Sequence, residues 1–153
     1  MGSQLDYMTA MPQSLRLLPE VPLPERPFQP GSGARPQLDG PEPWLWGLDL
    51  FNHGYYWEAH EVWEGLWIEL GRSSPAGLLV RGLIQAAAAS LKSVQGNQRG
   101  QEILAARALA TLKACGLSQW RGICVSDVMV QIERLPQPIY LHLTPSLPVH
   151  DAS

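Results

Sequence analysis

The 153-residue sequence predicts an all-α fold, a compact bundle of about five helices with extended proline-rich N- and C-terminal arms. Val and Ile are scattered through the central region and do not alternate with polar residues as they do in half-buried strands. Glycine, proline and capping residues divide that region into segments of helical length. Nine of the fourteen prolines precede Trp44, and proline at this density excludes helices and central strands. We therefore expect an arm over 1–43, a helical domain over 44–135 and a tail over 136–153.

Each expected helix is bounded by residues that start or stop helices. Glycines that can adopt positive φ follow the first four segments, at Gly54, Gly71, Gly96 and Gly116. N-capping residues open the last three, at Ser74 before Pro75, at Asn97 and at Ser126-Asp127. The short connections favour antiparallel neighbours. The predicted helices are 44–52, 55–70, 75–95, 98–114 and about 126–135.

The two arms carry weaker signals than the helices. We expect the N-terminal arm to be extended on the surface or partly disordered, so that removing its first 35 or so residues leaves the melting temperature nearly unchanged. The tail after Leu135 holds four more prolines. A short strand over 138–143 is a weakly signalled alternative for part of it.

Composition limits the classes of partner. The net charge is -3 and no block of lysine and arginine is present, which argues against nucleic acid and anionic membranes as partners. The apolar stretch 78–91 is interrupted by charge and too short to span a bilayer. Cys115 and Cys124 match no zinc-site spacing and are expected to be reduced, buried thiols of a cytoplasmic protein without a signal peptide. A small molecule, a protein partner or a homo-oligomer stays open.

The second helix carries the densest chemistry, in the sequence WEAHEVWEGLW from Trp57 to Trp67. At about 100° per residue, His60, Glu64 and Trp67 share one stripe, with Glu61 beside it and Glu58 on its flank. The core-facing residues Val62, Trp63 and Leu66 lie on the opposite side. His60 and Glu64 stand at i and i+4, so we expect their side chains to be within hydrogen-bonding contact, directly or through one water.

These residues resemble an uncharacterised bacterial and archaeal family, described as a domain of unknown function, whose helical signature is H-x-x-x-E-x-x-W. Here the signature falls on His60, Glu64 and Trp67. The preceding FNHGYYWEAHE from residue 51, GLIQAAAASLK over 82–92 and Gly96-Asn97 are also similar to the family's blocks. The resemblance implies a small all-helical fold over about residues 44–135 and supplies no reaction. Position 92 is often histidine in the family and is lysine here, which weakens a metal ligand at that position.

Four interpretations of the cluster stay open. His60 and Glu64 resemble part of a zincin motif and are weak candidates for metal ligands, although a third ligand is not evident. Alternatively, repulsion and burial raise the pKa of one glutamate, and His60, Glu61 or Glu64 acts in acid/base catalysis. A third interpretation is a structural hydrogen-bond network. The fourth is a ligand groove, whose candidate residues are Asn52, Tyr56, Trp57, Glu58, Trp67, Gln85 and Lys92.

The third helix is expected to complete this site. Arg81, Gln85 and Lys92 share a stripe, and small alanines between them allow close approach of the second helix. Gln85 or Lys92 would then compensate the acidic cluster. The sequence as a whole predicts a binding or structural module organised around His60, Glu64 and Trp67, with no cofactor assigned. The alternative is a hydrolase-type enzyme that uses His60 and Glu64 as acid/base or metal-binding groups.

Overall fold

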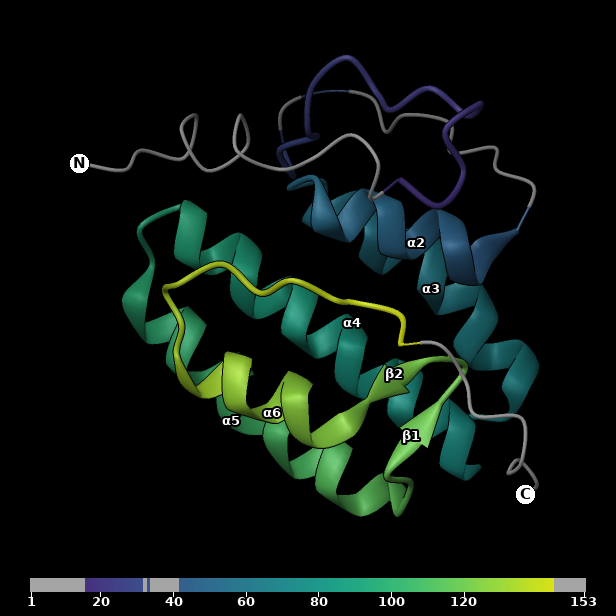
Figure 1. The fold of residues 1–153 in the computed structure, drawn as a ribbon. Coiled ribbons are helices and arrows are strands. Elements are labelled where there is room, and N and C mark those ends of the chain that lie inside the picture. The colour runs from purple at the N-terminus through teal and green to yellow at the C-terminus, as the bar shows by residue number, and fades with distance from the viewer. Residues whose placement is uncertain (1–15, 32, 34–41, 145–153) are drawn as a thin grey trace.

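The fold is a bundle of α-helices. The computed structural model describes residues 16–31, 33 and 42–144, and this part of the chain contains five helices (Figure 1). Their ends differ from the predicted ends by at most two residues, so the all-α prediction is confirmed. The helices are α2 (Pro43–Asn52), α3 (Tyr56–Leu70), α4 (Pro75–Val94), α5 (Gln98–Cys115) and α6 (Val125–Glu133).

Two of the three predicted N-capping sites act at helix ends, those at Ser74 and Asn97. The predicted cap at Ser126-Asp127 is wrong, because α6 already begins at Val125, with Cys124 at the N-cap and no side-chain cap hydrogen bond. The Ser74 hydroxyl accepts a hydrogen bond from Gly77 N at 3.0 Å and starts α4. The Asn97 side chain accepts one from Gly100 N at 2.8 Å and starts α5. Gly116 ends α5 in the left-handed conformation, with φ at 74°. Each of the two side-chain caps satisfies a backbone N–H that has no partner inside its own helix.

The core extends through all five helices and is rich in aromatic side chains where α2 meets α3. Trp63 is fully buried, with its ring centroid 5.9 Å from that of Phe51 and 6.0 Å from that of Trp44. Glycine allows the helices to approach closely at two points. A Cβ atom on Gly47 would lie 2.0 Å from Trp63 Nε1, and one on Gly82 would lie 2.5 Å from a Leu112 methyl. A side chain at either glycine would force the helices apart.

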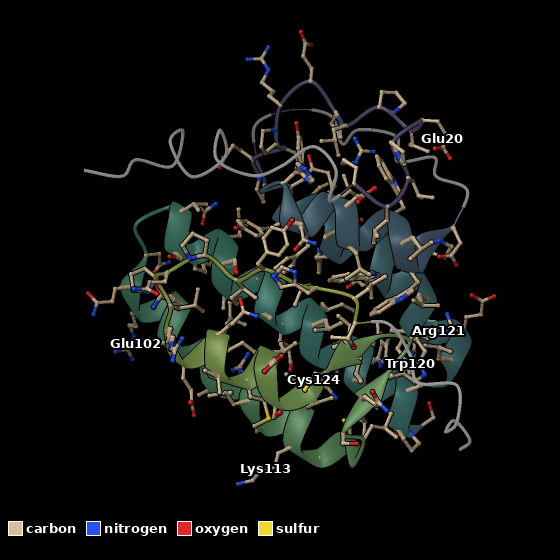
Figure 2. All side chains as sticks on the ribbon, in the orientation of Figure 1. Glu20, Glu102, Lys113, Trp120, Arg121 and Cys124 are labelled. Atoms are coloured by element: carbon tan, nitrogen blue, oxygen red, sulfur yellow. The ribbon has the colours of Figure 1, made fainter. Side chains whose placement is uncertain are left out.

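A short hairpin between α5 and α6 escapes the sequence prediction. Strands β1 (Gln119–Trp120) and β2 (Ile123–Cys124) pair antiparallel. Two residues per strand are too few to display alternation. Arg121 and Gly122 connect them with φ of 45° and 89°, the positive values that two-residue hairpin turns of type I′ require. The Arg121 guanidinium lies over the Trp120 ring, 4.4 Å from its centroid (Figure 2).

The C-terminal segment 136–144 completes the core between α2 and α6. It is extended, and Ile139 and Leu141 are buried. The strand considered over 138–143 does not form, because side-chain amides replace a neighbouring strand. Asn52 of α2 donates to Leu141 O at 2.9 Å and accepts from Leu141 N at 2.8 Å. Gln131 of α6 brackets the adjacent Tyr140 in the same way, at 2.9 and 2.7 Å.

The N-terminal segment 16–28 packs over α2 and α3 (Figure 1). The fully buried Asp49 carboxylate accepts hydrogen bonds from the backbone N–H groups of Leu17 and Leu18, at 2.7 and 2.8 Å. Arg16 Nε lies 3.0 Å from Asp49 Oδ2, an ion pair whose geometry is not that of a hydrogen bond. These contacts change the expectation that the first 35 residues contribute little to core stability.

A second set of contacts fastens the same segment to α3. The fully buried Glu58 accepts a hydrogen bond from Phe28 N at 2.7 Å through Oε2. The Phe28 ring packs on Trp57 with centroids 4.3 Å apart, and Tyr55 at the start of α3 donates to Pro24 O at 2.6 Å. The arm therefore covers two buried acids and an indole that the helices leave open.

The remaining predictions concern cysteines and membranes. Both cysteines are free, as expected, but only Cys115 is buried. Cys124 is partly exposed because it ends β2 at the edge of the hairpin, so the prediction of two buried thiols is wrong at this position. Among the described helices, none combines the length and apolar character needed to cross a membrane.

Candidate functional site

The ionisable side chains of α3 differ in their exposure to solvent. Glu58 is fully buried under the arm, whereas the side chains of His60, Glu61 and Glu64 are 29%, 24% and 49% exposed. Trp63 and the other core residues occupy a separate face. The predicted cluster of three glutamates is thus divided. Glu58 is buried under the N-terminal arm, whereas Glu61 and Glu64 lie with His60 at the surface.

The imidazole of His60 stands between the two surface carboxylates. His60 Nε2 lies 3.4 Å from Glu64 Oε2, which confirms the contact expected from the i, i+4 spacing. His60 Nδ1 lies 3.5 Å from Glu61 Oε2. One potential metal-binding atom from each of the three side chains lies within 4.8 Å of the others. We call His60, Glu61 and Glu64 the surface triad.

The spacing of the surface triad suits a single metal ion. Zinc binds imidazole nitrogen and carboxylate oxygen at about 2.0–2.2 Å in a tetrahedral arrangement, so two of its ligand atoms are about 3.4 Å apart. The three atoms lie within 4.8 Å of one another and would reach that separation by rotation of the partly exposed side chains. From the sequence, His60 and Glu64 are weak candidates for metal ligands and Glu61 is a candidate for catalysis only. The structure adds Glu61 to the same set of donors.

Trp67, the third residue of the signature, packs against arginines. Its Nε1 donates a hydrogen bond to Arg72 O at 3.1 Å, in the turn after α3. The guanidinium carbons of Arg72 and Arg81 lie 5.3 and 5.9 Å from its ring centroid. These distances permit cation–π attraction. Trp67 therefore connects α3 to the turn and to α4.

One residue of the predicted α4 stripe contacts α3, because the Arg81 guanidinium lies over the Trp67 ring. Gln85, one turn further along, is partly buried, and its Oε1 has no hydrogen-bond partner among the described residues. Lys92 is partly buried near the end of α4. Completion of the site by Gln85 or Lys92 stays a prediction, because the contact established between this stripe and α3 is that of Arg81 with Trp67.

Three other candidate ligand-binding residues are held in packing contacts or hydrogen bonds with other parts of the chain. Asn52 holds the C-terminal segment, and Trp57 packs on Phe28 of the arm. Tyr56 is buried against Phe51, with ring centroids 5.2 Å apart. Asn52 and Trp57 are covered by segments distant in the sequence, which helical periodicity alone does not reveal.

Burial gives Glu58 an unusual carboxyl group. Desolvation raises its pKa above the ordinary range, and the hydrogen bond from Phe28 N opposes this only in part. Its Oε1 has no hydrogen-bond partner among the described residues. The acid/base interpretation expected such a carboxylate beside His60. The structure instead places it under the arm, where it accepts the Phe28 N–H.

The comparisons agree with the resemblance noted in the sequence. Residues 44–104 match a family model described as "Domain of unknown function (DUF309)". The matched region contains α2, α3 and α4 and the beginning of α5, and so includes the whole surface triad. No curated protein and no solved structure gives a significant match.

Proposed function

We propose that this protein is a binding module in which His60, Glu61 and Glu64 bind one divalent transition-metal ion. The observation that carries the proposal is the convergence of one imidazole nitrogen and two carboxylate oxygens within 4.8 Å on a partly exposed face. A mixed nitrogen and oxygen donor set suits zinc, manganese or ferrous iron.

Packing does not account for the surface triad. The core contacts of α3 come from Ala59, Trp63 and Leu66, which are 0%, 0% and 5% exposed. The buried carboxylate of the helix, Glu58, accepts a hydrogen bond from Phe28 N of the N-terminal arm. A purely structural network would be covered, since its purpose is to satisfy polar groups removed from water. The partly exposed side chains of the surface triad lose little hydration free energy on folding and remain accessible to a ligand.

A hydrolase-type enzyme is the second candidate. Its supporting observation is the same exposure, because an ion held by three protein groups retains a position for water. Metal-bound water is a nucleophile at neutral pH. Zinc-dependent ester hydrolysis that disappears in His60→Ala would favour this candidate over simple binding.

Titration of the untagged full-length protein with zinc and manganese, followed by calorimetry, tests the proposal. We expect one ion per chain and tighter binding of zinc, as the general order of divalent affinities requires. His60→Ala should weaken zinc binding at least about tenfold, an effect of about 1.4 kcal/mol. Affinity should also fall as the pH is lowered, because imidazole binds metal only when neutral.

The matched control is Glu69→Gln, which neutralises an exposed glutamate of the same helix outside the surface triad. It should bind zinc as the unaltered protein does, whereas Glu64→Gln should bind more weakly. Equal affinity for the unaltered protein, His60→Ala and Glu64→Gln would overturn the proposal.

A further inference from the structure

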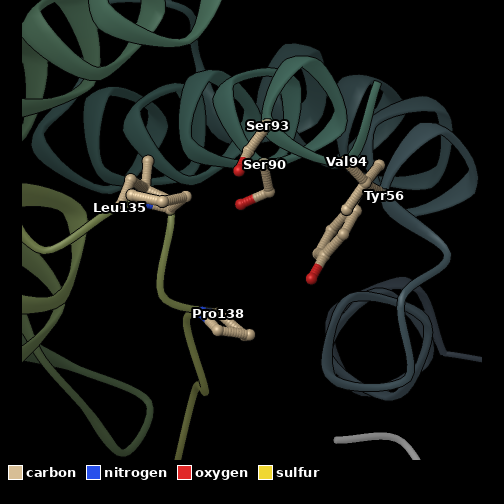
Figure 3. A pocket seen from close by; sticks show the side chains of 7 residues that line it. Tyr56, Ser90, Ser93, Val94, Leu135 and Pro138 are labelled. Carbon is tan, nitrogen blue, oxygen red and sulfur yellow. The ribbon is translucent and has the colours of Figure 1, made fainter. Parts of the chain in front are cut away.

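A pocket lies where α3 begins, α4 ends and the C-terminal segment turns past them. Its volume is about 280 Å³, at the lower limit of the roughly 300–1,000 Å³ typical of small-molecule sites. Figure 3 shows side chains from the three segments converging on it. The lining residues are Tyr56, Ser90, Ser93, Val94, Leu135, Pro136 and Pro138.

Ser90 is the distinctive group in this pocket. The residue is 2% exposed, and its hydroxyl oxygen has no hydrogen-bond partner among the described residues. A serine inside a helix commonly bonds to the carbonyl one turn earlier, which would satisfy it. Here the hydroxyl points into the pocket, as does that of Tyr56 (Figure 3). A buried polar group without a partner is costly, so it calls for an explanation at this position.

The lining defines the chemistry of a suitable ligand. None of the lining residues carries a charge, which disfavours ions whose hydration shell would be lost without compensation. Hydroxyl groups gather on the α3 and α4 side, and hydroxyls both donate and accept hydrogen bonds. Val94, Leu135 and the prolines supply apolar surface. The match is a compact neutral molecule with an apolar body and one hydroxyl or carbonyl group.

We propose that this pocket binds a small neutral molecule whose hydroxyl or carbonyl group hydrogen-bonds to Ser90. The inference is independent of the metal proposal, because the two sets of residues have no member in common. The sequence analysis missed Ser90 because it lies in the alanine-rich stretch AAAASLKS, which has the pattern of close helix packing. Tyr56 is one of the ligand-binding candidates from the sequence, and it lines this pocket.

Cyclohexanol, an apolar ring with one hydroxyl, is the probe. It is titrated into the full-length protein, and backbone amide shifts are recorded by NMR. We expect saturable shifts at Ser90, Ser93, Val94 and Leu135. Cyclohexanecarboxylate has the same ring with a charge and should produce no saturable shifts there. Ser90→Ala should weaken cyclohexanol binding roughly two- to tenfold, the range for one net hydrogen bond.

The variant also reports on its own folding. Removing a buried hydroxyl that lacks a partner should leave the melting temperature unchanged or raise it. Ser73→Ala, at an exposed serine in the turn between α3 and α4, is the control and should bind the probe like the unaltered protein. Equal binding by Ser90→Ala, equal binding of the carboxylate, or the absence of saturable shifts would each overturn the proposal.

Discussion

Replacing Asp49 with asparagine should release the N-terminal arm and destabilise the protein by about 3 kcal/mol. Asp49 is fully buried and accepts two backbone N–H groups from the arm, while Arg16 supplies a cation at 3.0 Å. Asparagine has nearly the same shape. It keeps one acceptor oxygen, but it replaces the other with a donor that faces the N–H groups and loses the charge that Arg16 compensates.

The magnitude follows from the contacts. A hydrogen bond to a charged group contributes about 1.5–3 kcal/mol, and breaking a buried ion pair costs about 3–5 kcal/mol. These values are not additive, because Arg16, Leu17 and Leu18 all belong to one segment. Once the arm lifts, Arg16 returns to water and no further cost arises. The free energy of docking the arm is therefore the upper limit, and we expect an effect of about 2–4 kcal/mol.

Urea unfolding followed by circular dichroism measures this effect in the full-length chain and in a chain that begins at residue 30. Asp49→Asn should be costly in the full-length chain and cost less than about 0.5 kcal/mol in the shortened one, where its partners are absent. Glu25→Gln, at an exposed position in the arm, should have little effect in the full-length chain. An equal loss of unfolding free energy on Asp49→Asn in both chains would refute the proposal that Asp49 holds the N-terminal arm on α2.

Three further predictions concern α3 and the C-terminal segment. Burial raises the pKa of Glu58, so the folded state binds this proton more tightly than the unfolded state and ionisation at higher pH costs stability. Glu58→Gln should therefore gain stability relative to the unaltered protein between about pH 4 and pH 8 in urea melts, and a difference independent of pH would contradict this. Asn52→Ala should cost about 2–4 kcal/mol, because it leaves both backbone groups of the buried Leu141 unpaired, and a loss under about 0.5 kcal/mol would count against the bracket. Glu64→Gln and Lys92→Met should show coupled effects if α4 completes the site, whereas strict additivity would separate the two positions.

The helices were predictable because their determinants are local. Capping by Ser74 and Asn97, the left-handed Gly116 and the 3.6-residue period all act within a few residues of the elements they define. The same period places His60 and Glu64 one helical turn apart, so their contact does not depend on any tertiary contact. Chemistry within one helix is therefore accessible to sequence analysis.

The segments that cover the helices were not predictable, because their contacts are remote. Leu17 meets Asp49 across 32 positions, and Asn52 meets Leu141 across 89. The proline-rich N-terminal arm has no hydrophobic periodicity from which its contacts with the helices could be predicted. Glu58, Glu61 and Glu64 are the same residue type in the sequence, and the contact of Glu58 with the arm distinguishes it from the other two in the structure. The hairpin at Arg121 was missed for a different reason, the shortness of its strands.

X-ray absorption spectroscopy of the zinc-loaded protein tests the metal-binding proposal most directly, because it reports the ligands themselves. We predict a first shell of nitrogen and oxygen at about 2.0–2.2 Å with the outer-shell signal of one imidazole, and loss of that signal in His60→Ala. A sulfur shell near 2.3 Å, or an imidazole signal that persists in His60→Ala, would place the ion elsewhere and contradict the assignment of His60, Glu61 and Glu64.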